Sequence, residues 1–232
     1  MLSELIMLMD VIDDPQAHSQ SYQQAVVDDN CLGKPTVKSR VLSYQHLRSL
    51  YGLETSVPAF RALRYFWQRD ENSKALLALL CAYSRDIILR ENTSFILDLP
   101  AGTIISREDT EDEISLKYGD RFSAAMLRST AQNINGTWTQ SGHLLGKVKK
   151  TRTLVEPTPG AVAYALFLGN QDDLRGMNLL TSQYTHLLDN GKERIIDLAE
   201  IASAKGWMIW RRLQDVVEVD FPKLKTQEDL FS

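Results

Sequence analysis

Two groups of basic residues could bind the phosphates of a nucleic acid, because each group has almost no acidic neighbours. Between Gly33 and Arg69 there are seven Lys and Arg residues against the single acid Glu54, and between His143 and Val155 there are four against none. A chain of net charge −4 that separates its charges in this way can still present a basic surface. The predicted DNA-contacting residues are Lys34, Lys38, Arg40, Arg48, Lys147, Lys149, Lys150 and Arg152.

The second group lies in residues 146–152, which we expect to form a hydrated, glycine-flanked loop that reaches a duplex backbone. Hydroxyl and amide residues from Thr137 to Ser141 would add neutral phosphate donors. The alternative is that these lysines only keep a loop soluble, since charge runs are usually solvated. In the first group, Arg61 and Arg64 are expected to pair with acids of a neighbouring helix rather than with DNA.

Other chemistry finds little support in the sequence. Residues 33–36 have the Gly-Lys of a phosphate-binding loop, but Asp28 stands where the pattern needs its first glycine. The four histidines are scattered, and no zinc or nucleophile motif is present. The acidic run 107–120 is typical of a solvated helix start, and Asp220 with Lys223 lacks the second acid of a nuclease site. We therefore expect no enzyme activity, cofactor or metal.

The elements that would position these residues are mostly helices. Hydrophobic spacing predicts helices over 2–12, 16–30, 34–51, 59–69, 73–90, 122–135, 158–168, 178–188 and 195–204. Residues 106–113 are an acidic stretch that leads into another helical pattern. Residues 207–213 and 216–221 predict a hairpin that turns at Gln214 and Asp215. The expected fold is mainly α: a two-lobed helical bundle with a small C-terminal β-hairpin. The acidic stretch near 100–120 would divide an N-terminal helical lobe, 1–105, from a C-terminal lobe, 106–232.

The C-terminal hairpin leaves two interpretations open. With the helix before it, it resembles the last half of a winged helix, in which Arg211 and Arg212 would touch DNA. The alternative, which we favour slightly, is that the hairpin caps the core. Likewise, Trp138, Trp207 and Trp210 could stack on bases, although core packing is the usual role of tryptophan in such patterns.

The chain is expected to be a cytoplasmic protein without a membrane segment. Its first ten residues carry Glu4 and Asp10 instead of the basic start of a signal peptide. The longest uncharged apolar runs, 75–83 and 160–169, are shorter than the roughly 20 residues that span a bilayer. Two cysteines in unrelated surroundings, Cys31 and Cys81, fit a reducing compartment.

Several stretches resemble the BrxA family of BREX phage-defence systems. They are residues 30–34 with Thr36 and Arg40, residues 47–51, residues 76–90, and the run Thr137-Trp138-Thr139-Gln140-Ser141-Gly142-His143-Leu144, which continues through Lys147 to Arg152. Residues 157–159, 161–168 and 175–188 complete the resemblance. The resemblance implies a small helical DNA-binding accessory protein encoded beside a DNA methyltransferase, a large ATPase and a phosphatase-like protein. The predicted function is thus non-enzymatic binding of double-stranded DNA, mainly through phosphates, in antiviral defence. The alternative is a structural adaptor that bridges other BREX components through its basic face.

Overall fold

The computed structural model describes residues 1–214 and 216–225, so that Asp215 of the predicted hairpin turn lies outside the described residues. The chain forms two compact units: unit 1 combines Met1–Arg85 with the chain from Pro157 onward, and unit 2 is Asp86–Glu156. Unit 2 is thus an insertion into unit 1. The predicted lobes 1–105 and 106–232 do not correspond to these units. The acidic stretch that suggested the boundary begins a helix inside unit 2.

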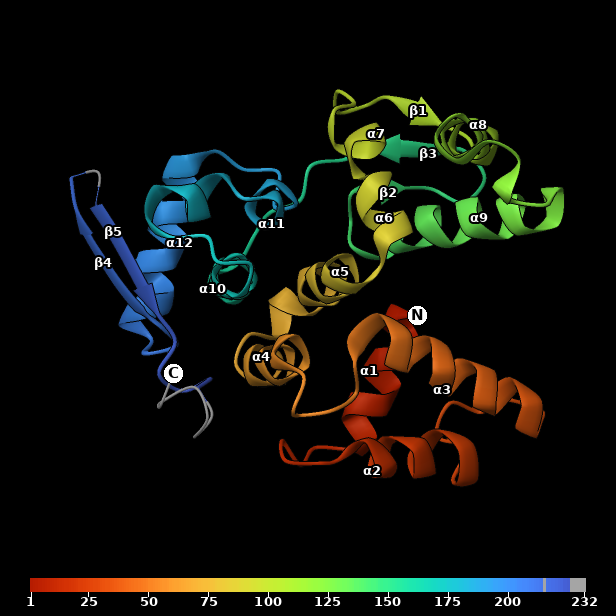
Figure 1. The fold of residues 1–232 in the computed structure, drawn as a ribbon, viewed down its shortest axis with the longest axis horizontal. Coiled ribbons are helices and arrows are strands. Elements are labelled where there is room, and N and C mark those ends of the chain that lie inside the picture. Colours follow the sequence, from red (N-terminus) through yellow and green to blue (C-terminus); the bar gives the residue numbers. More distant parts are fainter. Residues whose placement is uncertain (215, 226–232) are drawn as a thin grey trace. The chain divides into compact units, whose positions relative to one another are not determined.

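The first part of unit 1 is a run of short helices (Figure 1). They are α1 (Leu2–Val11), α2 (Ser19–Gln23) with the π-helical turn η1 (Gln24–Asp28), α3 (Val37–Tyr51), α4 (Pro58–Trp67), the 3₁₀ turn η2 (Glu71–Ser73) and α5 (Lys74–Arg85). The two ends of helix α3 are set by local capping. The Thr36 hydroxyl accepts a hydrogen bond from the Ser39 amide, and Gly52 ends the helix at a φ of 92°.

The second part of unit 1 supplies its central helix. It consists of α10 (Pro159–Gln171), the 3₁₀ helix η4 (Gly176–Thr181), α11 (Gln183–His186), α12 (Lys192–Ala204) and the hairpin β4 (Ile209–Leu213) and β5 (Val216–Asp220). Every residue of α10 from Gly160 to Gly169 is buried, because α4, α5, α11 and α12 all pack against it. The terminal hairpin lies beside α12, and the Phe221 ring meets Phe167 of α10 edge-on.

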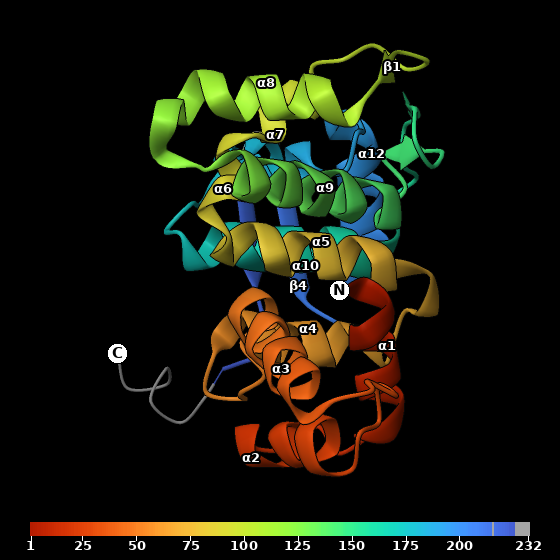
Figure 2. The same cartoon turned by 90° about the vertical axis from the view of Figure 1, so that its right-hand side faces the viewer.

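Unit 2 runs helix, helix, strand, helix, helix, strand, strand. Its elements are α6 (Ile87–Glu91), α7 (Thr93–Leu97), β1 (Ile104–Ile105), α8 (Arg107–Tyr118), the 3₁₀ turn η3 (Gly119–Arg121), α9 (Ala124–Gln140), β2 (Leu144–Leu145) and β3 (Lys150–Arg152). The strands form an antiparallel sheet in the order β1-β3-β2, with Thr151 of β3 paired to both Ile104 and Leu145. Figure 2 shows α8 and α9 lying side by side, as their packing contacts require.

The mainly helical fold and the C-terminal hairpin are confirmed. The three-stranded sheet of unit 2 was not predicted. The expected helix 73–90 is broken at Asp86. Helix α5 ends just before this residue, and the Asp86 side chain caps the next helix, α6. Helix α9 continues through Gly136 to Gln140, beyond the end predicted at residue 135. In α3, Val37 at the start is 63% exposed, while Tyr44 and Leu47 further along the helix are buried.

No helix among the described residues is both long and apolar enough to cross a membrane.

Candidate nucleic-acid interface

The β2–β3 hairpin places Lys147 and Lys149 at its exposed tip. The turn between the strands depends on Gly146, which has a φ of 119°; a Cβ there would stand 2.4 Å from the Lys149 carbonyl oxygen. Neither lysine forms an ion pair or a side-chain hydrogen bond with any part of the chain that the structure describes. Both ammonium groups are therefore available to an external anion.

Lys150 is held differently from its neighbours. Its Nζ donates hydrogen bonds to Thr139 Oγ1 of α9 at 2.8 Å and to the Gly146 carbonyl at 3.2 Å. Partial burial lowers the pKa of this ammonium group. Lys150 therefore ties the hairpin to α9, and a phosphate contact would have to compete with these bonds.

Arg152 does not fit the prediction of a phosphate-contacting loop residue, because it is only 1% exposed. Its Nε donates to the Ile96 carbonyl of α7 at 2.9 Å, and its Nη1 donates to the Thr153 carbonyl. Its backbone joins β3 to residues 102 and 103. An arginine buried in this way is a structural group of unit 2, and residues 150–152 are a strand rather than a hydrated loop.

Helices α8 and α9 make a helix-turn-helix with a five-residue connection, 119–123. Gly119 ends α8 at a φ of 56°, and the Ser123 hydroxyl accepts a hydrogen bond from the Met126 amide to begin α9. Between the two helices, Thr110 Oγ1 donates to Asn135 Oδ1 at 3.0 Å in a buried position. The spacing of the two helices is thus set by a specific hydrogen bond as well as by packing.

The far end of α9 is locked to the hairpin. Trp138 is fully buried, and its ring meets the buried His143 ring edge-on with centroids 4.9 Å apart. The His143 amide donates to the Trp138 carbonyl, and His143 Nδ1 lies 2.8 Å from Ser141 Oγ. The residues that carried the sequence resemblance here therefore build a rigid corner between α9 and β2, and Trp138 is not placed to stack on bases.

The segment without acidic residues extends well beyond the basic residues 146–152 identified in the sequence. No Asp or Glu occurs from Arg121 to Val155, which covers the last three residues of the connection into α9, the whole of α9 and the hairpin. Arg121 and Arg128 add two cations to this segment, and both side chains are exposed. This stretch could have been found by counting acids instead of bases. Counting acids does not show, however, that the stretch contains an exposed helix beside the hairpin.

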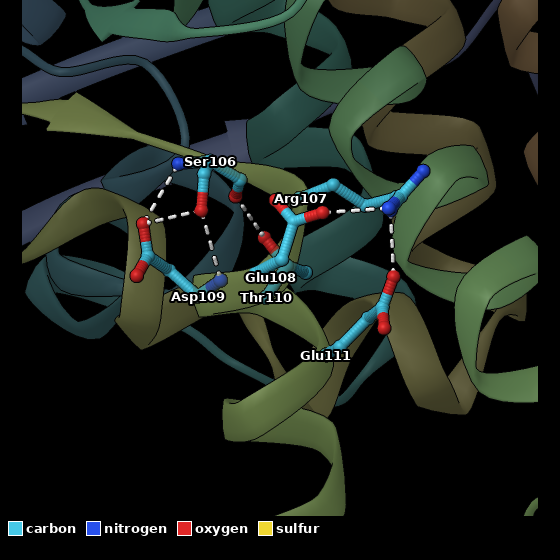
Figure 3. Close-up of polar contacts among 6 residues, drawn as sticks. All are labelled: Ser106, Arg107, Glu108, Asp109, Thr110 and Glu111. Carbon is cyan, nitrogen blue, oxygen red and sulfur yellow. Dashed lines mark hydrogen bonds and ion pairs between the residues drawn. The ribbon is translucent and has the colours of Figure 1, made fainter. Parts of the chain in front are cut away.

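The acids of unit 2 gather instead at the start of α8 (Figure 3). Ser106 and Asp109 form a reciprocal capping box, in which each side chain accepts a hydrogen bond from the other residue's amide. Arg107 pairs with Glu108 and Glu111, both at 2.6 Å. The expectation of a helix start, where acids complement the helix dipole, is confirmed.

The first basic group is split between paired and exposed side chains, all on unit 1. Lys34 Nζ lies 2.6 Å from Glu4 Oε1. Arg40 donates to the carbonyls of Lys34 and Val27. Lys38 and Arg48 are exposed on α3, a helix without a single acid, and neither has a side-chain partner within residues 1–214 and 216–225. Of the four predicted residues here, these two remain available for an anion.

The other basic residues considered in the sequence are engaged with the protein. Arg64 is 3% exposed and donates to the carbonyls of Ile12 and Asp13, so its partners are main-chain oxygens rather than the acids expected. Arg61 donates hydrogen bonds to the Thr55 and Leu224 carbonyls. In the C-terminal hairpin, Arg211 pairs with Glu218 at 3.2 Å, and Arg212 Nε donates to the Gln214 carbonyl.

Within the described residues, no group of three or more His, Cys, Asp and Glu side chains is placed to hold a metal ion. Comparison of the chain with protein families, with curated proteins and with solved structures finds no match.

Proposed function

We propose that this protein binds double-stranded DNA without catalysing a reaction on it, and that unit 2 provides the main contact surface. One observation carries the proposal: an acid-free helix, α9, lies against a hairpin whose tip presents Lys147 and Lys149 without partners among the described residues. Phosphate attraction supplies most of the affinity of a non-specific DNA complex, and it needs cations that are not already neutralised.

The connectivity of unit 2 supports this choice over a generic anion site. Unit 2 has two short helices, a strand, two longer helices and a hairpin, with strand order β1-β3-β2. From α7 onward this connectivity resembles that of a winged helix-turn-helix. In such modules the second helix of the pair enters the major groove, which admits an α-helix. Here that helix is α9, and the hairpin is the wing.

The decisive experiment is a salt-resolved binding curve on duplex DNA for wild type and K147A/K149A. If each lysine neutralises one phosphate, the slope of log K against log salt becomes shallower by about 1.8, at roughly 0.9 per contact. The matched control is K223A/K225A, which removes the same charge from two exposed lysines of unit 1; Lys225 pairs with Asp220 at 2.8 Å. The control should keep the wild-type slope.

Other results would redirect the proposal. Equal loss of slope in both variants would mean that total charge, rather than the hairpin, attracts DNA. A parallel variant, K38A/R48A, tests α3 as a separate contact surface on unit 1. If wild type shows no salt-dependent affinity for duplex DNA, DNA binding is refuted, and the adaptor with a basic face becomes the better explanation.

The resemblance to the BrxA family extends the proposal to an accessory role in a BREX system, with the methyltransferase, the ATPase and the phosphatase-like protein as candidate partners. This extension rests on the residues of the sequence alone. Co-purification of a tagged chain with those three proteins, expressed together from one locus, tests it. Absence of all three from the purified material, with the tagged chain folded, would refute it.

A further inference from the structure

Helix α9 exposes a set of side chains that phosphate binding does not require. Arg128, Gln132 and Asn133 are all exposed, and Arg128 lies one helical turn before Gln132. None of the three side chains forms a hydrogen bond or ion pair with a described residue. The two amides carry no charge, so they contribute little to the general attraction of a polyanion. Their donor and acceptor groups face solvent on the helix proposed to meet DNA.

The backbone that carries these side chains is well fixed. Asn135 is held by Thr110 of α8, Thr139 accepts a hydrogen bond from Lys150 of the hairpin, and Trp138 is packed on His143. The buried positions Ala131, Ile134 and Trp138 anchor α9 on one side. Gln132 and Asn133 lie outside that buried side, and Gln132, seven residues before Thr139, shares the side of the helix that Lys150 contacts. A fixed helix presents its side chains in a defined geometry, which is what discrimination between base pairs needs.

The chemistry of these groups identifies their ligand. Asn and Gln amides form paired hydrogen bonds with N6 and N7 of adenine in the major groove, and Arg does the same with O6 and N7 of guanine. A helix without any acid can approach the groove without repulsion from the flanking phosphates. We propose that α9 enters the major groove and that Gln132 and Asn133 read adenine there, while Lys147 and Lys149 contact the neighbouring phosphates. This inference rests on the proposed binding of duplex DNA and adds sequence preference to it.

The test starts with selection of wild-type binding sites from a randomised duplex pool. Enriched sites should contain adenines at fixed positions, and replacing those A·T pairs by G·C should weaken binding about tenfold or more for each paired contact. Substituting 7-deazaadenine, which removes only the N7 acceptor in the major groove, should also weaken wild-type binding at those positions. This second measurement needs no protein variant, so it does not depend on the folding of a mutant.

The protein variant is Q132A/N133A, with Q20A/Q23A on α2 as the matched control that removes two exposed amides from unit 1. Q132A/N133A should keep the wild-type affinity and salt slope on random duplex within about twofold, yet lose the preference for adenine sites. Q132E, which replaces one amide by a carboxylate of the same shape, should weaken the enriched site more than random duplex. The control should behave as wild type.

The outcomes separate the inference from the function on which it rests. Salt-dependent binding without an enriched site, or an adenine preference that survives in Q132A/N133A, overturns base reading by α9 and leaves DNA binding intact. Unchanged affinity for 7-deazaadenine duplexes also overturns it. If wild type binds no duplex at all, both proposals fail. Adenine preference that is lost with the two amides and with N7 supports the inference.

Discussion

Replacing Arg152 by methionine should destabilise unit 2 strongly, although the sequence suggests a surface residue. Methionine retains much of the buried volume but removes the guanidinium group that donates to the Ile96 and Thr153 carbonyls. A buried acceptor left without its donor costs about 1–3 kcal/mol. The Ile96 carbonyl loses its buried bond from Arg152 but keeps a long one, 3.4 Å, from the Leu99 amide, and the Thr153 carbonyl loses a partly buried bond, so we expect a loss of about 2–3 kcal/mol. That is a large share of the stability of an ordinary domain, roughly 5–15 kcal/mol.

Hydrogen exchange read peptide by peptide can assign the loss to one unit. In R152M, amides of residues 86–156 should exchange faster, and urea unfolding should shift by the amount given above. K147A/K149A, two positions on the same hairpin, should change stability by less than about 0.5 kcal/mol. Wild-type protection of residues 86–156 in R152M would refute the structural role of Arg152. A further consequence is that any DNA-binding variant that includes Arg152 would confound lost contacts with lost folding.

Three smaller predictions concern stability. Gly136→Ala should raise the free energy of unfolding by about 0.5–1 kcal/mol, because the glycine lies inside α9 and an added Cβ would have no atom within 4 Å; a loss in a urea titration would contradict this. Ser106→Ala should cost about 1 kcal/mol in the same titration, since it removes the cap of α8, and an unchanged midpoint would argue against the cap. Burial raises the pKa of the Cys81 thiol from about 9 to about 11, so the unfolded chain loses this proton first and stability falls as pH rises through that window. Wild type should lose about 2–3 kcal/mol more between pH 9 and 11 than Cys81→Ala, and parallel pH profiles would disprove the assignment.

Local signals in the sequence predicted local structure well. Thr36, Ser106 and Gly52 sit where helices begin or end, because capping depends on residues within one turn. The hairpin at the C-terminus was also predictable, since β-branched and aromatic residues on both sides of a short turn favour it. The expected helix through residue 90 failed at Asp86, where a side chain that can cap competes with helix continuation.

The candidate site was only partly predictable. The strands β1, β2 and β3 have two or three residues each, which is too short for an alternating pattern to be visible. Without those strands, Arg152 could not be distinguished from Lys147 and Lys149, because its burial depends on Ile96, which lies 56 residues away in the chain. Charge counting identified the hairpin lysines. It could not identify Gln132 and Asn133, whose relevance depends on the exposed face of α9.

The insertion of unit 2 has a consequence for the order in which the chain can fold during synthesis. Residues 86–156 form a compact unit from one continuous stretch, so they can fold as soon as they leave the ribosome. The N-terminal helices cannot complete their core at that moment, because α10, which α4 and α5 cover, is made only afterwards. The apolar surfaces of α4 and α5 therefore remain exposed to solvent while about 70 further residues are translated. Slowed translation within residues 86–156 would prolong that exposure and favour aggregation of the nascent chain.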